Sequence, residues 1–236
     1  MEFSLRLRDD VVRVNKSLIR EGLVIETWGN ASAIDNLTKR VLIKSSGVPF
    51  ENLKPEDISE VDLDGNIYNI YKPSVDTPTH LEIYKGFKEV GGIVHTHSHY
   101  ATVFAQAKMS IPCLGTTHAD YFKGDIPIIP ELSEEEVKED YELYTGKKIV
   151  QYFKEKNIDP LDIPAVLLPN HGVFVWGKTV EEALNNAIIL VRIAKMAYET
   201  ISLVRMHNKD PNITSDLIRK HFQRKHGSDR YYGQNK

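Results

Sequence analysis

Residues 92–99 read Gly-Ile-Val-His-Thr-His-Ser-His. The apolar run after two glycines predicts a short buried strand, and alternate residues of a strand point to the same face. His95 and His97 are therefore expected to present two imidazoles side by side. His171 lies in a second tight segment, between two further predicted strands, and can supply a third nitrogen. Three neutral imidazoles with open coordination positions describe a catalytic metal site rather than a closed structural one.

Two alternatives remain open at this point. His99 continues the alternation only if the strand extends, so it is a competing ligand that ranks below His171. A His-x-His pair is also compatible with ordinary core or loop histidines that hold no metal. Zinc suits imidazole ligands, and manganese can occupy such sites when it is available.

The rest of the chain predicts an α/β fold with a mixed central β-sheet covered by helices on its faces. Helical spacing, capping boxes and stop signals predict helices over 4–20, 77–90, 100–107, 133–156, 179–206 and from 214 or 215 onward. The predicted capping boxes are Ser133 with Glu136 and Thr179 with Glu182. Strand signals fall at 41–44, 58–62, 67–71, 92–97, 165–168 and 173–176. Thr77 is expected as the cap of its helix with Pro78 in the first turn, and Thr145-Gly146 as a break in another.

Composition narrows the class of protein. The chain has 236 residues, a net charge of −3 and one cysteine, Cys113. This length suits a single domain over 1–236, and the mixed charges give no argument for nucleic acid or a membrane surface. The N-terminus lacks the apolar core of a signal peptide, and the most apolar stretch is interrupted by charges. We therefore expect a cytoplasmic protein without a disulfide.

Further segments resemble the class II aldolase/epimerase family nearly end to end. They are Thr27–Ser32, Ile43–Val48, Ser74–His80, Gly91–Ser98, Gly115–Phe122, Asn170–Gly172 and the tail Arg224–Gly227 with Tyr231–Gln234. The Thr116–Phe122 run and the Tyr-Tyr-Gly-Gln ending are similar to the epimerase branch. The resemblance implies a class II aldolase-like fold, a divalent metal on His95, His97 and His171, and interconversion of L-ribulose 5-phosphate with D-xylulose 5-phosphate.

The chemistry favours a retro-aldol route for that reaction. The C4 hydrogen of a 2-ketose is not adjacent to the C2 carbonyl, so its removal gives no stabilised enolate. Deprotonating the C4 hydroxyl instead breaks C3–C4, and a Lewis-acidic metal stabilises the three-carbon enediolate. The aldehyde then presents its other face before the bond reforms. Such a route needs proton-handling groups on both sides of the aldehyde.

The resemblance assigns these groups residue by residue. Asp120 and Tyr232 match the family's acid/base pair, and His221 matches another active-site histidine. Asp76 stands where fuculose phosphate aldolases carry a glutamate beside the metal, and its shorter reach favours epimerisation over net cleavage. Tyr232 is expected to come from a neighbouring subunit, so the tail from about 214 to 236 would complete another chain's site in a homotetramer.

The resemblance also places the substrate phosphate. Lysine charge, glycine backbone and hydroxyl donors suit phosphate binding. The matching residues are Asn30, Lys44, Ser46, Gly47, Ser74, Val75 and Thr116. Val75 departs from the branch, which has a second serine there, so a hydroxyl contact is lost. Asn170, where epimerases carry a serine, is nearer to the aldolases.

Two rival functions remain open, and the departures raise the first of them. The first is a class II aldolase that cleaves a ketose 1-phosphate to dihydroxyacetone phosphate and an aldehyde. The second is a metal-binding interaction protein without catalysis. The pathway served, arabinose or ascorbate breakdown, stays open because both require the same epimerisation.

Overall fold

A computed structural model describes residues 2–228, 230 and 231. Its strands are β1 (Gly29–Asp35), β2 (Arg40–Lys44), β3 (Ile58–Asp62), β4 (Gly92–Thr96), β5 (Ala165–Leu167) and β6 (Val173–Gly177). They form one sheet in the order β3-β2-β1-β4-β6-β5, and each neighbouring pair is antiparallel. The expected mixed sheet is thus an antiparallel one, with a parallel bridge only between Ile128 and Leu167 among the described residues.

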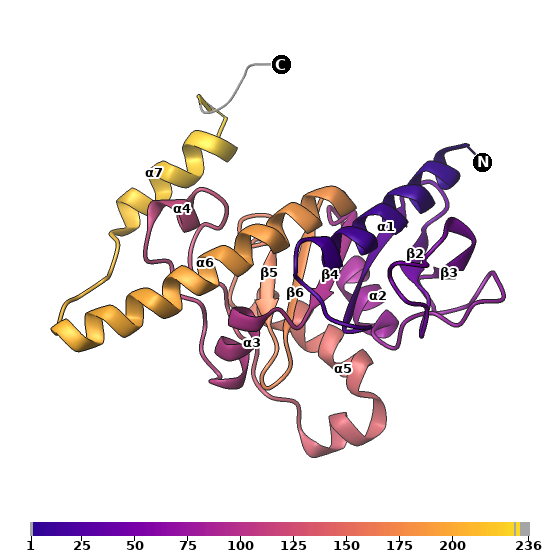
Figure 1. Cartoon of the computed structure of the whole chain (residues 1–236), viewed down its shortest axis with the longest axis horizontal. Helices are drawn as coiled ribbons and strands as arrows, with labels where there is room; N and C mark the ends of the chain where they lie inside the picture. The colour runs from indigo at the N-terminus through magenta and orange to yellow at the C-terminus, as the bar shows by residue number, and fades with distance from the viewer. Residues whose placement is uncertain (1, 229, 232–236) are drawn as a thin grey trace.

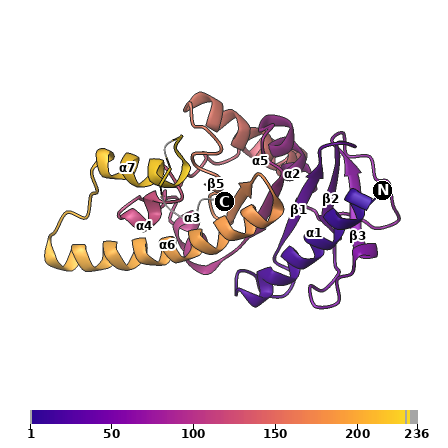
Figure 2. The same ribbon diagram turned by 90° about the horizontal axis from the view of Figure 1, so that it is seen from above.

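Helices cover both faces of this sheet (Figure 1; Figure 2). One core lies under α1 (Glu2–Arg20), α3 (His99–Gln106) and α6 (Val180–His207). The other lies under α2 (Thr77–Gly86) and α5 (Glu134–Glu155). Strand alternation divides the cores: Ile93 of β4 packs on the α2 side and Val94 on the α6 side. The expected single α/β domain is confirmed.

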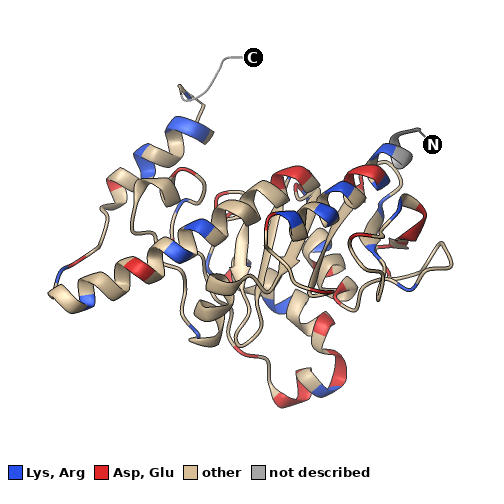
Figure 3. Ribbon diagram, in the orientation of Figure 1, with Lys and Arg blue, Asp and Glu red and all other residues tan. Residues whose placement is uncertain are grey.

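Three shorter elements complete the described chain. A 3-10 turn, η1 (Pro55–Asp57), precedes β3, and α4 (Thr116–Ala119) lies against α7 (Ser215–His226). The pair α4 and α7 sits at one end of the molecule, beyond the sheet, where the second half of α6 extends (Figure 1). No helix of the described part is long and apolar enough to cross a bilayer. Acidic and basic residues are interspersed along the ribbon, apart from the acidic first turn of α5 (Figure 3).

One predicted strand is wrong and one strand was missed. Residues 67–71 make only an isolated bridge through Ile67 to Val61. The amide of Asn69 takes up the edge of β3 instead, since its Nδ2 donates to the Ile58 carbonyl at 2.7 Å. The missed strand is β1, which the sheet buries between β2 and β4.

Two helix boundaries also differ from expectation. The cap of α2 is Asp76 rather than Thr77, whose hydroxyl donates to the Ser74 carbonyl at 2.6 Å. This helix ends at Gly86 rather than near residue 90, because the backbone of Phe87 is no longer helical. The Phe87 ring packs against Trp176, with the ring centroids 5.3 Å apart.

The break in α5 lies at Asp140, not at Thr145-Gly146. Asp140 is non-helical, and its side chain accepts from the Leu143 N–H at 3.0 Å, so it caps the second half. Gly146 allows close packing instead: a Cβ there would lie 2.6 Å from Cβ of Glu82 on α2. The expected capping box of Ser133 and Glu136 is confirmed. At α6, Thr179 caps as expected, but the Glu182 carboxylate binds the Lys178 N–H instead.

Candidate metal centre

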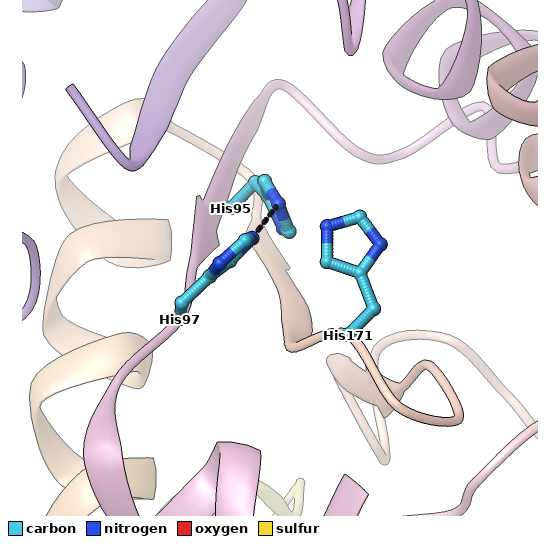
Figure 4. Close-up of side chains that lie close together, drawn as sticks. All are labelled: His95, His97 and His171. Atoms are coloured by element: carbon cyan, nitrogen blue, oxygen red, sulfur yellow. Dashed lines mark hydrogen bonds between the residues drawn. The ribbon is translucent and has the colours of Figure 1, made fainter. Parts of the chain in front are cut away.

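Three histidines converge where β4 ends and the β5–β6 connection turns back (Figure 4). His95, His97 and His171 each offer a ring nitrogen, and these nitrogens all lie within 4.8 Å of one another. The Nε2 atoms of His95 and His97 are 3.1 Å apart, as the strand alternation predicted. His99 is the first residue of α3 and is exposed, outside this cluster.

Hydrogen bonds from outside the triad engage Nδ1 of two of its three rings. Nδ1 of His95 donates to the Val173 carbonyl at 3.0 Å, so Nε2 keeps its lone pair. Nδ1 of His171 is 2.7 Å from the hydroxyl of Tyr141 on α5, which leaves its Nε2 available. Partners of this kind orient the ligands of metal sites and tune their basicity.

Burial keeps these rings neutral. Burial, reinforced by the neighbouring His95, lowers the pKa of His97 to about 4. Burial and the two neighbouring rings lower the pKa of His171 to about 4 as well. A divalent transition metal requires unprotonated imidazole, so the triad fits such an ion over the neutral pH range. Three nitrogen donors leave coordination positions for a substrate.

A second cluster adjoins the triad through β1. Asn30 is the sheet neighbour of His95, and its side chain is 2 % exposed. Its Nδ2 donates to Asp76 Oδ2 at 2.6 Å and to Ser74 Oγ at 3.0 Å. Burial alone would raise the pKa of Asp76, but the nearby His95 and His80 and the bond from Asn30 outweigh it and lower that pKa. Asp76 is thus held against the Asn30–Ser74 pair, and no described hydrogen bond ties it to the triad.

Lys44 is a buried cation without a described carboxylate partner. Lys44 is only 3 % exposed. Its Nζ lies 3.3 Å from the Ser45 carbonyl oxygen and 4.7 Å from the centroid of the Phe50 ring. Burial lowers the pKa of this amine. A buried charge normally requires a counter-charge, so this arrangement suits an anionic ligand.

Two loop segments meet beside Lys44. The Ser46 N–H donates to the Lys72 carbonyl at 2.9 Å, and the Ser74 N–H donates to the Lys44 carbonyl at 3.1 Å. Gly47 has φ +73°, a conformation that other residues seldom adopt, and a Cβ there would meet nothing within 4 Å. Position 47 therefore favours glycine because of its backbone conformation and not because a neighbouring atom would clash with a side chain.

The two departures from the epimerase pattern have structural readings. Val75 is 62 % exposed beside Ser74, so its apolar side chain replaces a hydroxyl at the loop surface. Asn170 has φ +59°, which asparagine tolerates better than most residues. Its Nδ2 lies 3.2 Å from Glu131 Oε1 rather than in the triad.

The predicted acid/base residue Asp120 lies in a separate cluster between α4 and α7. Arg224 binds it with two bonds, Nε to Oδ1 at 3.0 Å and a terminal nitrogen to Oδ2 at 2.8 Å. Nδ1 of His221 is 3.1 Å from Oδ1. Burial would raise the pKa of Asp120, but these bonds from Arg224 and His221 lower it. The chain thus brings Asp120 and His221 together.

No described hydrogen bond or ion pair joins the cluster of Asp120, His221 and Arg224 to the triad. Thr116, the first residue of α4, is half-buried and its carbonyl accepts from the Asp120 N–H. Helix α4 lies at the end of the molecule away from β2, the strand that ends at Lys44 (Figure 1). Tyr232 lies outside the described residues. Tyr141 and Arg224 were not singled out from the sequence, although Arg224 lies within a quoted motif; nothing local in the sequence marks Tyr141.

A cavity of about 560 Å³ opens on the triad. His97 and His171 line it together with Trp28 and Tyr141, and much of its remaining wall is apolar. The triad therefore has the polar Asn30–Asp76 cluster as one neighbour and an open cavity as another. A small ligand could reach the metal position from solvent.

The fold and the three-histidine centre together describe an α/β protein with a candidate metal-binding site. Residues 9–198 match the family described as Class II Aldolase and Adducin N-terminal domain. The chain belongs to this family, whose class II aldolases are enzymes that depend on a divalent metal.

Solved structures share the fold. An L-fuculose 1-phosphate aldolase is 22 % identical with a TM-score of 0.71, over 91 % of this chain and 95 % of that one. YgbL from Escherichia coli, to which an aldolase, epimerase or decarboxylase activity is ascribed, is 24 % identical with a TM-score of 0.71, over 92 % and 98 %. L-fuculose-1-phosphate aldolase from Thermus thermophilus is 25 % identical with a TM-score of 0.62, over 88 % and 99 %.

Proposed function

We propose that this protein is an L-ribulose-5-phosphate 4-epimerase, which inverts C4 by breaking and re-forming C3–C4. The observation that carries the proposal is the juxtaposition of a three-histidine centre with an anion site. Asn30 links them, because it neighbours His95 in the sheet and binds Ser74, whose N–H in turn binds the Lys44 carbonyl. A small sugar phosphate has the two features that such a site recognises, vicinal oxygens and a phosphate.

Each side of the site has its own task. Zinc or manganese on His95, His97 and His171 would supply Lewis-acid stabilisation of negative charge on neighbouring substrate oxygens. Lys44 would bind the phosphate with its ammonium, and Asn30, Ser46, Gly47 and Ser74 would surround it.

The position of Asp76 favours the epimerase over the aldolase. Its carboxylate is held by Asn30 and Ser74, on the phosphate side. A carboxylate so placed is poorly situated to protonate the three-carbon fragment, which would favour re-formation of the C3–C4 bond over net cleavage. The aldolase remains the second candidate, because L-fuculose 1-phosphate aldolases are among the structures that share this fold.

The C4 hydroxyl proton would be handled by Asp120 on one side and Tyr232 on the other. The low pKa of Asp120 keeps it ionised and able to accept a proton, while His221 contacts the same carboxylate. Tyr232 of one chain would reach Asp120 of another, so a neighbouring subunit would complete each site. A homotetramer in the cytoplasm, with the tail from about 214 to 236 at these shared sites, fits this arrangement.

Mixed oligomers test the shared site. Asp120→Asn and Tyr232→Phe proteins should each be nearly inactive, and hybrids of the two should regain activity through sites that receive both intact residues. Hybrids that form but remain inactive would contradict the shared site.

Substrate assays test the reaction itself. The metal-loaded protein should convert L-ribulose 5-phosphate to its C4 epimer with little free glycolaldehyde phosphate. Release of dihydroxyacetone phosphate from a ketose 1-phosphate, without epimer formation, would instead establish the aldolase.

A further inference from the structure

A pair of buried polar contacts joins α2 to β1 beside the metal centre. Asn30 binds Asp76 at 2.6 Å, and Ser32 Oγ lies 2.7 Å from His80 Nδ1. The two strand residues are two positions apart and the two helix residues four apart, spacings of about 6–7 Å in either element. The contacts are therefore consecutive rungs of one polar ladder between the helix and the strand.

Hydrogen bonds along the second rung fix the tautomer of His80. Tyr84 is buried, and Ser32 Oγ, 2.8 Å away, is the one hydrogen-bond partner of its hydroxyl among the described side chains, so the Tyr84 hydroxyl donates to Ser32 Oγ. The Ser32 hydroxyl then donates to His80 Nδ1. Burial lowers the pKa of His80 to about 3, so the ring is neutral. A neutral imidazole that accepts at Nδ1 carries its proton on Nε2.

That Nε2–H lacks a hydrogen-bond partner in the described part of the chain, although His80 is fully buried. Asn30 Oδ1, on the first rung, is a buried acceptor that likewise lacks one. Both described bonds to the Asp76 carboxylate go to Oδ2, which leaves Oδ1. One donor and two acceptors are the complement of a single water molecule, and buried polar groups are normally satisfied in this way.

We propose that His80 is a positioning residue for Asp76: its Nε2–H binds one ordered water that bonds to Asn30 Oδ1 and Asp76 Oδ1. This water holds the carboxylate at a fixed place beside His95, the sheet neighbour of Asn30. The importance of His80 for turnover rests on the proposed function, in which the Asp76 carboxylate lies on the phosphate side of the substrate. The tautomer and the water contact do not.

A packing role makes a different prediction. His80 contacts Phe174 edge-on at 5.4 Å, and Phe174 stacks on His95 at 4.2 Å, so the ring also fills the core under the metal centre. If His80 serves only to fill the core, activity should depend only on the volume of its side chain and on its hydrogen bond to Ser32. Asparagine and glutamine separate the two roles, because the amide of asparagine reaches the place of Nδ1 and that of glutamine the place of Nε2.

The kinetic test compares His80→Gln with His80→Asn in the metal-loaded full chain. Glutamine should keep most of the wild-type kcat on L-ribulose 5-phosphate, and asparagine should lower kcat by about 10- to 100-fold with bound metal unchanged. In an Asp76→Asn background the two variants should differ little. Equal activities of the two variants in the wild-type background would overturn the positioning role, as would an equally large difference in the Asp76→Asn background.

A spectroscopic test does not depend on turnover. Nitrogen NMR of the histidine-labelled, metal-loaded protein, with His80 assigned from His80→Gln, should show a proton on Nε2 and none on Nδ1. The Nε2–H resonance should move on Asp76→Asn. A proton on Nδ1, or a resonance indifferent to Asp76, would overturn the inference even if the protein is an epimerase. If the protein acts on neither substrate, the proposed function fails and this spectrum still decides about His80.

Discussion

Replacing Lys44 with methionine removes a cation that the fold buries without a described carboxylate. Burial lowers the pKa of Lys44, so the folded state holds this proton less tightly than the unfolded state. The resulting contribution to stability is present above the unfolded pKa near 10.5 and is lost as pH falls through the folded value. At neutral pH the free ammonium therefore destabilises the ligand-free protein. We expect Lys44→Met to unfold at the same temperature as wild type or a higher one.

An anion reverses the sign of this effect. A hydrogen bond to a charged group is worth about 1.5–3 kcal/mol, so Lys44→Met should weaken phosphate or substrate binding by about 10- to 150-fold. A ligand at ~100 times its Kd stabilises by ~2.7 kcal/mol, which corresponds to about 5–10 °C for a chain of this size. Inorganic phosphate should give such a rise in wild type and little in the variant.

Calorimetric unfolding with a phosphate titration measures both effects. Lys16→Met is the matched control, because Lys16 is exposed on α1 and its removal changes net charge equally. A Lys44→Met protein that is much less stable than wild type, yet still stabilised by phosphate to the same degree, would refute the assignment of Lys44 to an anion site.

Three further changes test the rest of the site. His97→Ala should lose the metal and the activity together, whereas His99→Ala should keep both; stoichiometric metal in the first variant, by elemental analysis, would contradict the triad. Tyr141→Phe should weaken metal affinity by about 10- to 100-fold in a competition titration, because His171 loses its outer partner; unchanged affinity would show that the hydroxyl is idle. Arg224→Gln should raise the pKa of Asp120 toward its ordinary value, since a depressing partner is removed. If Asp120 is the base, the acid limb of the pH–rate profile should then move to higher pH, and an unmoved limb would exclude it.

The triad could be predicted because its geometry is local. His95 and His97 share a face through strand alternation alone, and His171 follows from a tight connection between two recognisable strands. The partners of the triad are not local. Tyr141 reaches His171 across 30 positions of sequence from a helix on one face of the sheet, and no periodicity marks it.

The missed and misread strands have a common cause. The β1 sequence Gly-Asn-Ala-Ser-Ala is small and polar and contains no β-branched residue before Ile34, so propensity indicates a loop. It is a strand because β2 and β4 bind it on both sides. Residues 67–71 have the opposite character: their composition favours a strand, but the Asn69 side chain binds the Ile58 carbonyl and the Glu60 N–H of β3 in place of backbone groups.

The surroundings of Asp120 also could not be predicted from the sequence. Motif resemblance could name Asp120 and His221 but could not show that Arg224 binds the same carboxylate. Nor could it show that the cluster lies between α4 and α7, at the end of the molecule beyond the sheet (Figure 1). Side-chain choices such as these depend on how α7 docks on α4, which is a tertiary property.

Proton NMR of the metal-loaded protein acting on L-ribulose 5-phosphate in deuterium oxide tests the central claim most directly. A retro-aldol epimerase leaves the C4 hydrogen in place, because that carbon departs and returns as an aldehyde. We predict D-xylulose 5-phosphate that carries its original C4 proton. Absence of the epimer would contradict the proposed function, and deuterium at C4 would contradict the carbon–carbon cleavage.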